Sequence, residues 1–179
     1  MSLALGMPPP EFALAGVDGR THTLASYDDV EILVLIQSCN HCPYVLAWEE
    51  RMIEIQRDYA DRGVRLVAVC SNDAERYPHD SFEEMVAHSA NKGFNFDYLH
   101  DPDQSIARAL GSERTPEVFV FDGGRRLVYH GAIDDNRDEA AVGRTYLRDA
   151  LDAVLGDARP PVAETPPVGC TVKWLPTST

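Results

Sequence analysis

Two continuous apolar runs on either side of an amphipathic segment restrict the folds open to this chain. EILVLIQ (31–37) and VRLVAVC (64–70) have the length of strands and few polar residues, as expected for strands buried on both faces. Between them, apolar residues recur every three or four positions, which predicts a helix over about 40–62 ending at Gly63. A strand, a helix and a second strand in this order predict a parallel pair joined by a crossover.

The rest of the chain extends this α/β pattern. Turn signals at Asp18-Gly19 and Gly123-Gly124 predict two hairpins, and Ser81 followed by Glu84 predicts a capped helix. The remaining predicted elements are a strand at 98–100, a short helix at 105–110 and a last helix over about 138–155, which starts in the acidic run DDNRDEAA. We therefore expect one α/β domain over 8–156 and a Pro-rich tail over 157–179.

The charge balance argues against polyanionic partners. Sixteen Lys and Arg against 29 Asp and Glu give a net charge of −13, which would repel nucleic acid and anionic membranes. The first residues lack a basic segment, and no run approaches the roughly 20 apolar residues of a membrane helix. We expect a cytoplasmic protein, where four cysteines do not form a disulfide framework and a close pair is more often catalytic or metal-binding.

The close pair is Cys39 and Cys42, in QSCNHCPYVL, where the first buried strand meets the long helix. The unpaired N–H groups and positive dipole of a helix start favour a thiolate over a thiol, and we expect Cys39 to be the better-placed nucleophile. We expect Asn40 to be the N-cap, so that Pro43 falls in the first turn, where it does not break the helix. His41 could tune the thiols by a hydrogen bond or by its charge, or it could simply face solvent.

These motifs, taken with the order of elements, resemble the thioredoxin-like superfamily. The motif CNHC is followed further along the chain by RTPEVFVFD, and Thr115-Pro116 in that stretch fits the cis-proline loop of this superfamily. The opening PPEFALAGVDGRTHTLASY and the segment from SNDAERYPHDSFEEMV to FDYLHDPDQSIARALG are similar to the redoxin branch, with its AhpC/TSA, TlpA and ResA types. SCNHCPYVLAWEERM and GCTVKW resemble a bacterial group described as thiol-disulfide isomerases.

The resemblance implies a fold and a set of roles. The fold would be a thioredoxin-like three-layer sandwich, with an N-terminal hairpin and an insertion before the C-terminal hairpin. Cys39 would attack a disulfide and Cys42 would resolve the mixed disulfide, while Thr115 and Pro116 would bind the substrate. The partners would be a protein or small-molecule disulfide and a thiol reductant, and no cofactor is expected.

The chain also departs from its relatives. Thioredoxin has a buried Asp six residues before its first cysteine, and Leu33 stands there in this chain. Thioredoxin has Trp before that cysteine and Gly-Pro between the two, where this chain has Ser38 and Asn40-His41. A strongly reducing potential is therefore not expected.

Two other functions stay open at this point. A thiol-dependent peroxidase is suggested by the redoxin-like start, although the peroxiredoxin signature P-x-x-x-T-x-x-C fits neither cysteine. Counted back from Cys39, Ile36 and Ile32 take the Thr and Pro places, and counted back from Cys42, Cys39 and Leu35 take them. A module binding a soft metal such as Cu(I) would use Cys39 and Cys42, but one pair falls short of the four ligands of a structural zinc site.

The other two cysteines differ in their setting. Cys70 ends a buried strand, where a cysteine usually has a packing role. Cys170 lies in PPVGCTVKW, where Val172 and Trp174 could pin the tail back onto the domain. If the tail docks near the pair, Cys170 is a possible third redox cysteine, and otherwise it is a passive small residue. The remaining histidines are scattered, and we expect structural or solvated roles for them.

Overall fold

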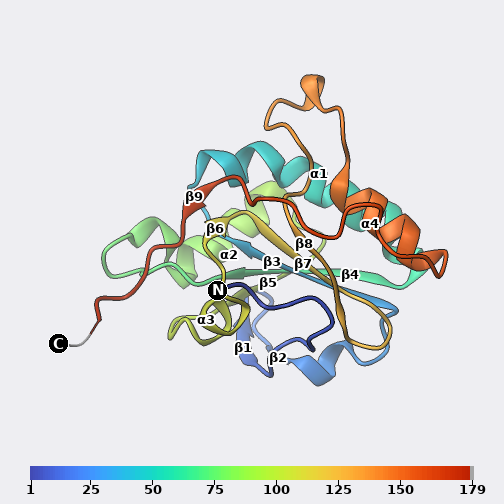
Figure 1. Ribbon diagram of the computed structural model, residues 1–179. Helices are drawn as coiled ribbons and strands as arrows, with labels where there is room; N and C mark the ends of the chain where they lie inside the picture. The colour runs from blue at the N-terminus through green and yellow to red at the C-terminus, as the bar shows by residue number, and fades with distance from the viewer. Residues whose placement is uncertain (178–179) are drawn as a thin grey trace.

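A seven-stranded mixed sheet forms the centre of the computed structural model, which describes residues 1–177 (Figure 1). Its strands are β1 (Ala13–Gly16), β2 (Thr21–Thr23), β3 (Ile32–Ser38), β4 (Val64–Cys70), β5 (Asp97–His100), β7 (Glu117–Phe121) and β8 (Leu127–Gly131). They lie in the order β2-β1-β5-β4-β3-β7-β8. Strands β3, β4 and β5 are parallel, and the others pair antiparallel. The predicted crossover, both hairpins and the mixed sheet are thus confirmed.

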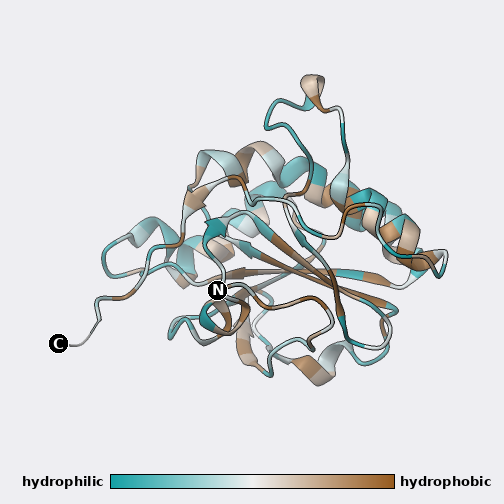
Figure 2. Cartoon of the chain, in the orientation of Figure 1, coloured by the Kyte–Doolittle hydropathy of each residue, from teal (hydrophilic) through white to brown (hydrophobic). Residues whose placement is uncertain are grey.

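Helices cover both faces of the sheet. The α-helices are α1 (Pro43–Tyr59), α2 (Phe82–Lys92), α3 (Ser105–Leu110) and α4 (Tyr146–Leu155), and the short 3-10 helices are η1 (Leu24–Tyr27), η2 (Ala60–Arg62), η3 (Pro78–Asp80) and η4 (Glu139–Ala141). Alternate β3 side chains enter two cores: Val34 and Ile36 pack with residues of α1, α2 and α4, whereas Leu33 and Leu35 pack with residues of α3 and η1. Figure 2 accordingly shows the central strands as the most hydrophobic part of the chain.

The last helix begins later than predicted. It starts at Tyr146 rather than near residue 138, and only the single turn of η4 lies in the acidic run. The reason is that Asp134 is buried and accepts hydrogen bonds from Trp48 (2.7 Å) and Arg51, both on α1. These bonds hold the start of the acidic run against α1 as a loop, so the chain cannot enter a helix there.

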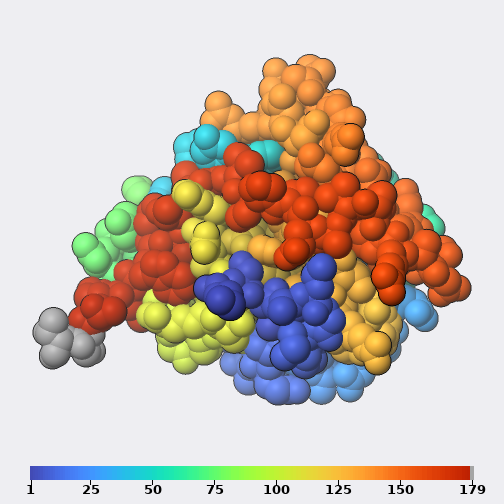
Figure 3. All heavy atoms as spheres, viewed as in Figure 1, coloured from blue at the N-terminus to red at the C-terminus, as the bar shows by residue number. Residues whose placement is uncertain are grey.

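Residues 163–175 of the tail make contacts with the domain. The His130 N–H donates to the carbonyl of Ala163, and the Thr165 N–H donates to the carbonyl of His130, both at 3.0 Å. Further on, β9 (Cys170–Thr171) pairs with β6 (Arg114–Thr115) in a separate two-stranded sheet. In Figure 3 the tail crosses the visible face as a continuous band. In the part of the chain that the structure describes, no helix has both the length and the apolar character needed to cross a bilayer.

Candidate redox site

Cys39 and Cys42 lie in the short connection between β3 and α1. This connection follows the carboxyl end of a central parallel strand, the edge at which open α/β sheets place their ligands. Both residues are thiols, and each is only 2% exposed. The sheet therefore brings the pair to its carboxyl edge, but other segments cover it.

The structure corrects the predicted helix cap. Cys42, with extended backbone, is the N-cap of α1, and Pro43 takes the first helical position, where proline is preferred. Asn40 is not the cap because its side chain is engaged elsewhere: its amide donates to the carbonyl of His79 (2.9 Å), and its oxygen accepts from the Tyr98 hydroxyl (2.7 Å). The positive end of the α1 dipole is therefore directed at Cys42.

The predicted proline loop lies against both sulfurs. The Thr115–Pro116 peptide bond is cis, and Thr115 is fully buried. The Sγ of Cys39 is 3.6 Å from the Thr115 hydroxyl, and the Sγ of Cys42 is 3.4 Å from the Thr115 carbonyl oxygen, which accepts the S–H of the neutral thiol. The structure thus brings Cys39, Cys42, Thr115 and Pro116 together.

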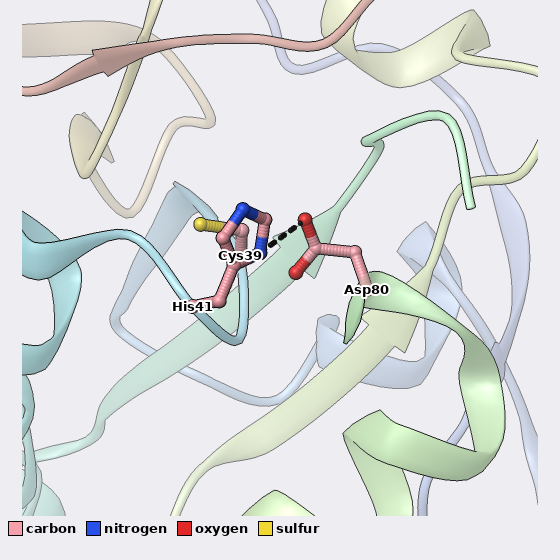
Figure 4. Close-up of side chains that lie close together, drawn as sticks. All are labelled: Cys39, His41 and Asp80. Atoms are coloured by element: carbon pink, nitrogen blue, oxygen red, sulfur yellow. Dashed lines mark ion pairs between the residues drawn. The ribbon is translucent and has the colours of Figure 1, made fainter. Parts of the chain in front are cut away.

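A buried carboxylate that the sequence analysis missed lies beside Cys39. Asp80, at the end of η3, is fully buried and accepts hydrogen bonds from the Asn40 N–H and from the Asn72 amide, both at 2.8 Å. His41 points its Nδ1 at Asp80, 2.9 Å from the carboxylate (Figure 4). Nothing in the local sequence reveals this role, because Asp80 reaches the site only through the insertion after β4.

The surroundings of the two sulfurs favour opposite protonation states. A hydrogen bond from the Cys39 thiol holds the pKa of Cys42 well below its ordinary range, and further bonds from the Cys170 thiol and the Val45 N–H add to this against the effect of burial. That same bond, burial and the nearby charge of Asp80 hold the pKa of Cys39 well above its ordinary range. These surroundings favour ionisation of Cys42 over ionisation of Cys39.

The other two cysteines also have distinct settings. Cys70 is completely buried, and burial raises its pKa to about 12, in agreement with the predicted packing role. Cys170 is half-buried in β9 and packs against the core cluster that contains Cys39 and Cys42. Burial and the neighbouring Cys42 raise the pKa of Cys170 to about 11. The tail therefore docks beside the cysteine pair.

Solved structures of two proteins resemble this chain over nearly its whole length. One is the hypothetical protein SMc02350 from Sinorhizobium meliloti 1021, with 37% identity and a TM-score of 0.92, covering 98% of this chain and 97% of that one. The other is an uncharacterized conserved protein from Geobacillus kaustophilus, with 37% identity and a TM-score of 0.92, covering 98% of this chain and 94% of that one. A comparison with curated proteins gives no match.

More distant structures share the fold. A putative thiol:disulfide interchange protein DsbE from Chlorobium tepidum is 23% identical, with a TM-score of 0.63, and the match covers 72% of this chain and 85% of that one. The Redoxin family model matches residues 4–146. Because this match covers most of the chain, the chain belongs to the Redoxin family, whose thioredoxin-like fold supports thiol–disulfide exchange or peroxidase-like chemistry.

Proposed function

We propose that the protein catalyses thiol–disulfide exchange, with Cys42 as the attacking thiolate and Cys39 as the resolving thiol. The observation that carries the proposal is the position of Cys42 at the N-terminus of α1, with Cys39 and the cis Thr115–Pro116 loop around its sulfur. A helix N-terminus stabilises a thiolate, which is the form that attacks disulfides. The more distant protein from Chlorobium tepidum is named as a putative thiol:disulfide interchange protein, and the Redoxin family supports the same class of reaction.

The reaction has two exchange steps. The Cys42 thiolate attacks one sulfur of a substrate disulfide, so that a mixed disulfide forms and the first substrate thiolate leaves and takes up a proton. Cys39 then loses its proton and attacks the Sγ of Cys42, which releases the second substrate thiolate. The substrate gains two electrons and the Cys39–Cys42 disulfide forms. An external thiol reductant restores the dithiol, and the reverse sequence would oxidise a dithiol.

This order of attack reverses the roles that the resemblance implies. Cys39 has the Asp80 carboxylate beside it, and this negative charge opposes its ionisation. Cys42 instead accepts hydrogen bonds from the Cys39 and Cys170 thiols and from the Val45 N–H, and these favour its ionisation. The reversal is therefore supported by the surroundings of each sulfur rather than by the order of the cysteines in the chain.

Trapping experiments test the proposal. The Cys39→Ser/Cys170→Ser variant, incubated with a model protein disulfide, should accumulate a mixed disulfide at Cys42, detected by mass spectrometry after alkylation, because neither Cys39 nor Cys170 remains to resolve it. The Cys42→Ser/Cys170→Ser variant, as the matched control, should trap little. Trapping mainly at Cys39 in Cys42→Ser/Cys170→Ser would overturn the assigned roles, and absence of trapping in both variants, with no exchange by the native chain, would overturn the function.

Peroxide reduction is the other reaction that the family supports, and the same thiolate is its candidate nucleophile. Stopped-flow mixing of the reduced protein with hydrogen peroxide separates the two reactions. We expect oxidation of Cys42 no faster than that of an ordinary thiolate, because the chain lacks the P-x-x-x-T-x-x-C signature.

Metal binding is a second candidate, favoured by one cluster. One ligand atom each from Cys39, His41 and Asp80 lies within 4.8 Å of the others (Figure 4). Three such ligands with a fourth open position are typical of a catalytic zinc site. Equilibrium dialysis of the reduced protein against Zn²⁺ should show stoichiometric binding that His41→Ala removes if this function is real. Unchanged weak binding in both proteins would exclude it.

A further inference from the structure

The tail contributes a strand to the redox site. In the β6–β9 pair, Cys170 lies directly opposite Thr115, the residue that precedes the cis-proline. Gly169 permits this approach, because a Cβ at that position would lie 2.0 Å from the Thr115 carbonyl oxygen. Strand β9 thus lies against the segment whose Thr115 contacts both sulfurs of the pair.

The edge of β6 that β9 occupies is one to which an extended peptide could add a strand. Such added strands bind through main-chain hydrogen bonds, with side chains setting the specificity. Here the chain's own residues make these bonds, and the residue in register with Thr115 is a cysteine. Cys170 therefore has the position that a cysteine of an added peptide would take.

The tail is anchored beyond this strand as well. Val172 is only 3% exposed, and the Lys173 N–H donates to the Asn72 side chain at 2.9 Å. The amide of Gln104 donates to the Lys173 carbonyl, and its oxygen accepts from the Leu175 N–H, both at 2.9 Å. Because these contacts follow Cys170 closely, they hold its thiol at a high effective concentration beside Cys42.

We infer that Cys170 is a third redox cysteine, held by β9 as an internal substrate strand, and that it forms a disulfide with Cys42 during turnover. The inference rests on the proposed function, since it requires a reactive Cys42. Cys39 and Cys170 are then alternative thiols that can resolve a mixed disulfide at Cys42. Cys39 lies in the β3–α1 connection, and Cys170 lies in β9 of the tail.

The step balances without an added oxidant. After Cys42 has attacked a disulfide RS–SR, the mixed disulfide Cys42–SR remains. The Cys170 thiol gives up its proton and attacks the Sγ of Cys42, so the Cys42–Cys170 bond forms and the Cys42–SR bond breaks. The leaving RS⁻ takes up the proton. The sulfurs of Cys42 and Cys170 are thereby oxidised to a disulfide, and the two substrate sulfurs are reduced to thiols.

A glutathione redox buffer provides the test with the full-length chain. The Cys39→Ser variant is equilibrated with glutathione and its disulfide, quenched with an alkylating agent and mapped by mass spectrometry. We expect the Cys42–Cys170 disulfide to predominate over the Cys42–glutathione adduct. Adding Gly169→Ala, which clashes with Thr115, should lower the ratio of disulfide to adduct by roughly tenfold or more.

Two controls separate docking from folding. Val172→Ala and Val168→Ala make the same change in the tail, at a buried and at a 48% exposed position. In the Cys39→Ser background, Val172→Ala should lower the disulfide-to-adduct ratio by roughly threefold or more, and Val168→Ala should leave it unchanged. Circular dichroism verifies that each variant is folded.

The outcomes distinguish this inference from the proposed function. A stable Cys42–glutathione adduct with no Cys42–Cys170 bond in folded Cys39→Ser would overturn the inference and leave the proposed function intact. Neither product in Cys39→Ser, together with no Cys39–Cys42 disulfide in the native chain, would overturn both. An equal disulfide-to-adduct ratio with and without Gly169→Ala would show that β9 does not hold Cys170 for the reaction.

Discussion

The two sides of the cysteine pair differ sharply, although only two residues separate the sulfurs. On the interior side, Cys39 lies beside a fully buried carboxylate whose oxygens are held by Asn40 and Asn72. On the outer side, Cys42 caps α1 and meets the Thr115 loop and the tail. The comparison teaches that the spacing of a CxxC motif does not decide which sulfur ionises. Here the hydrogen bond between the two sulfurs, burial and the neighbouring charge of Asp80 favour ionisation of Cys42 over that of Cys39.

Removing the sulfur of Cys42 should have the largest effect, which we expect on the rate of disulfide exchange. Cys42→Ser takes away the thiolate, and we expect the rate of disulfide exchange to fall by at least roughly 10³-fold, as for the loss of other nucleophiles. Cys39→Ser should retain the first step. Single-turnover rates of substrate thiol release measure this directly, and equal losses in both variants would remove the distinction between the two sides.

On the interior side, the largest expected effect is on stability. Asp80→Asn replaces a carboxylate that accepts from two buried donors, so one donor loses its partner at a cost of about 1–3 kcal/mol. Urea unfolding of the reduced protein measures the change. Asp29→Asn, at an exposed carboxylate, is the control and should change the free energy of unfolding by less than about 0.5 kcal/mol. Equal stabilities for the two variants would contradict a structural role for Asp80.

Much of the fold, but less of the site, could be predicted from the sequence. Apolar periodicity predicts β3, α1 and β4 within a few residues, and the resemblance to thioredoxin-like proteins assigns Thr115-Pro116 to the cis-proline loop. The cap was wrong because Asn40 has tertiary partners that stabilise a side-chain position outside the helix, and local propensity does not contain them. Asp80 was missed for the same reason, since only the folded insertion brings it to Cys39.

Replacing His41 should have the smallest effect, which we expect on the reduction potential of the cysteine pair. Its side chain is 37% exposed and its ring nitrogen faces the Asp80 carboxylate rather than Cys42. Because Asp80 offsets any positive charge on the ring, His41→Asn should shift the reduction potential by less than about 30 mV, a tenfold change in the exchange constant. Equilibration with glutathione buffers measures the potential, and His79→Asn is the matched control. A shift well beyond this size would make His41 a direct partner of the thiolate.

The pH dependence of the reduction potential tests the central claim most directly. Because the pKa of Cys42 is lowered and that of Cys39 is raised, reduction of their disulfide near neutral pH takes up one proton for two electrons. The potential should therefore fall by about 30 mV per pH unit between about pH 6 and 8, and more steeply only below the lowered pKa of Cys42. A fall of about 60 mV per pH unit across that range would mean that both sulfurs are protonated. That result would contradict a thiolate held at Cys42.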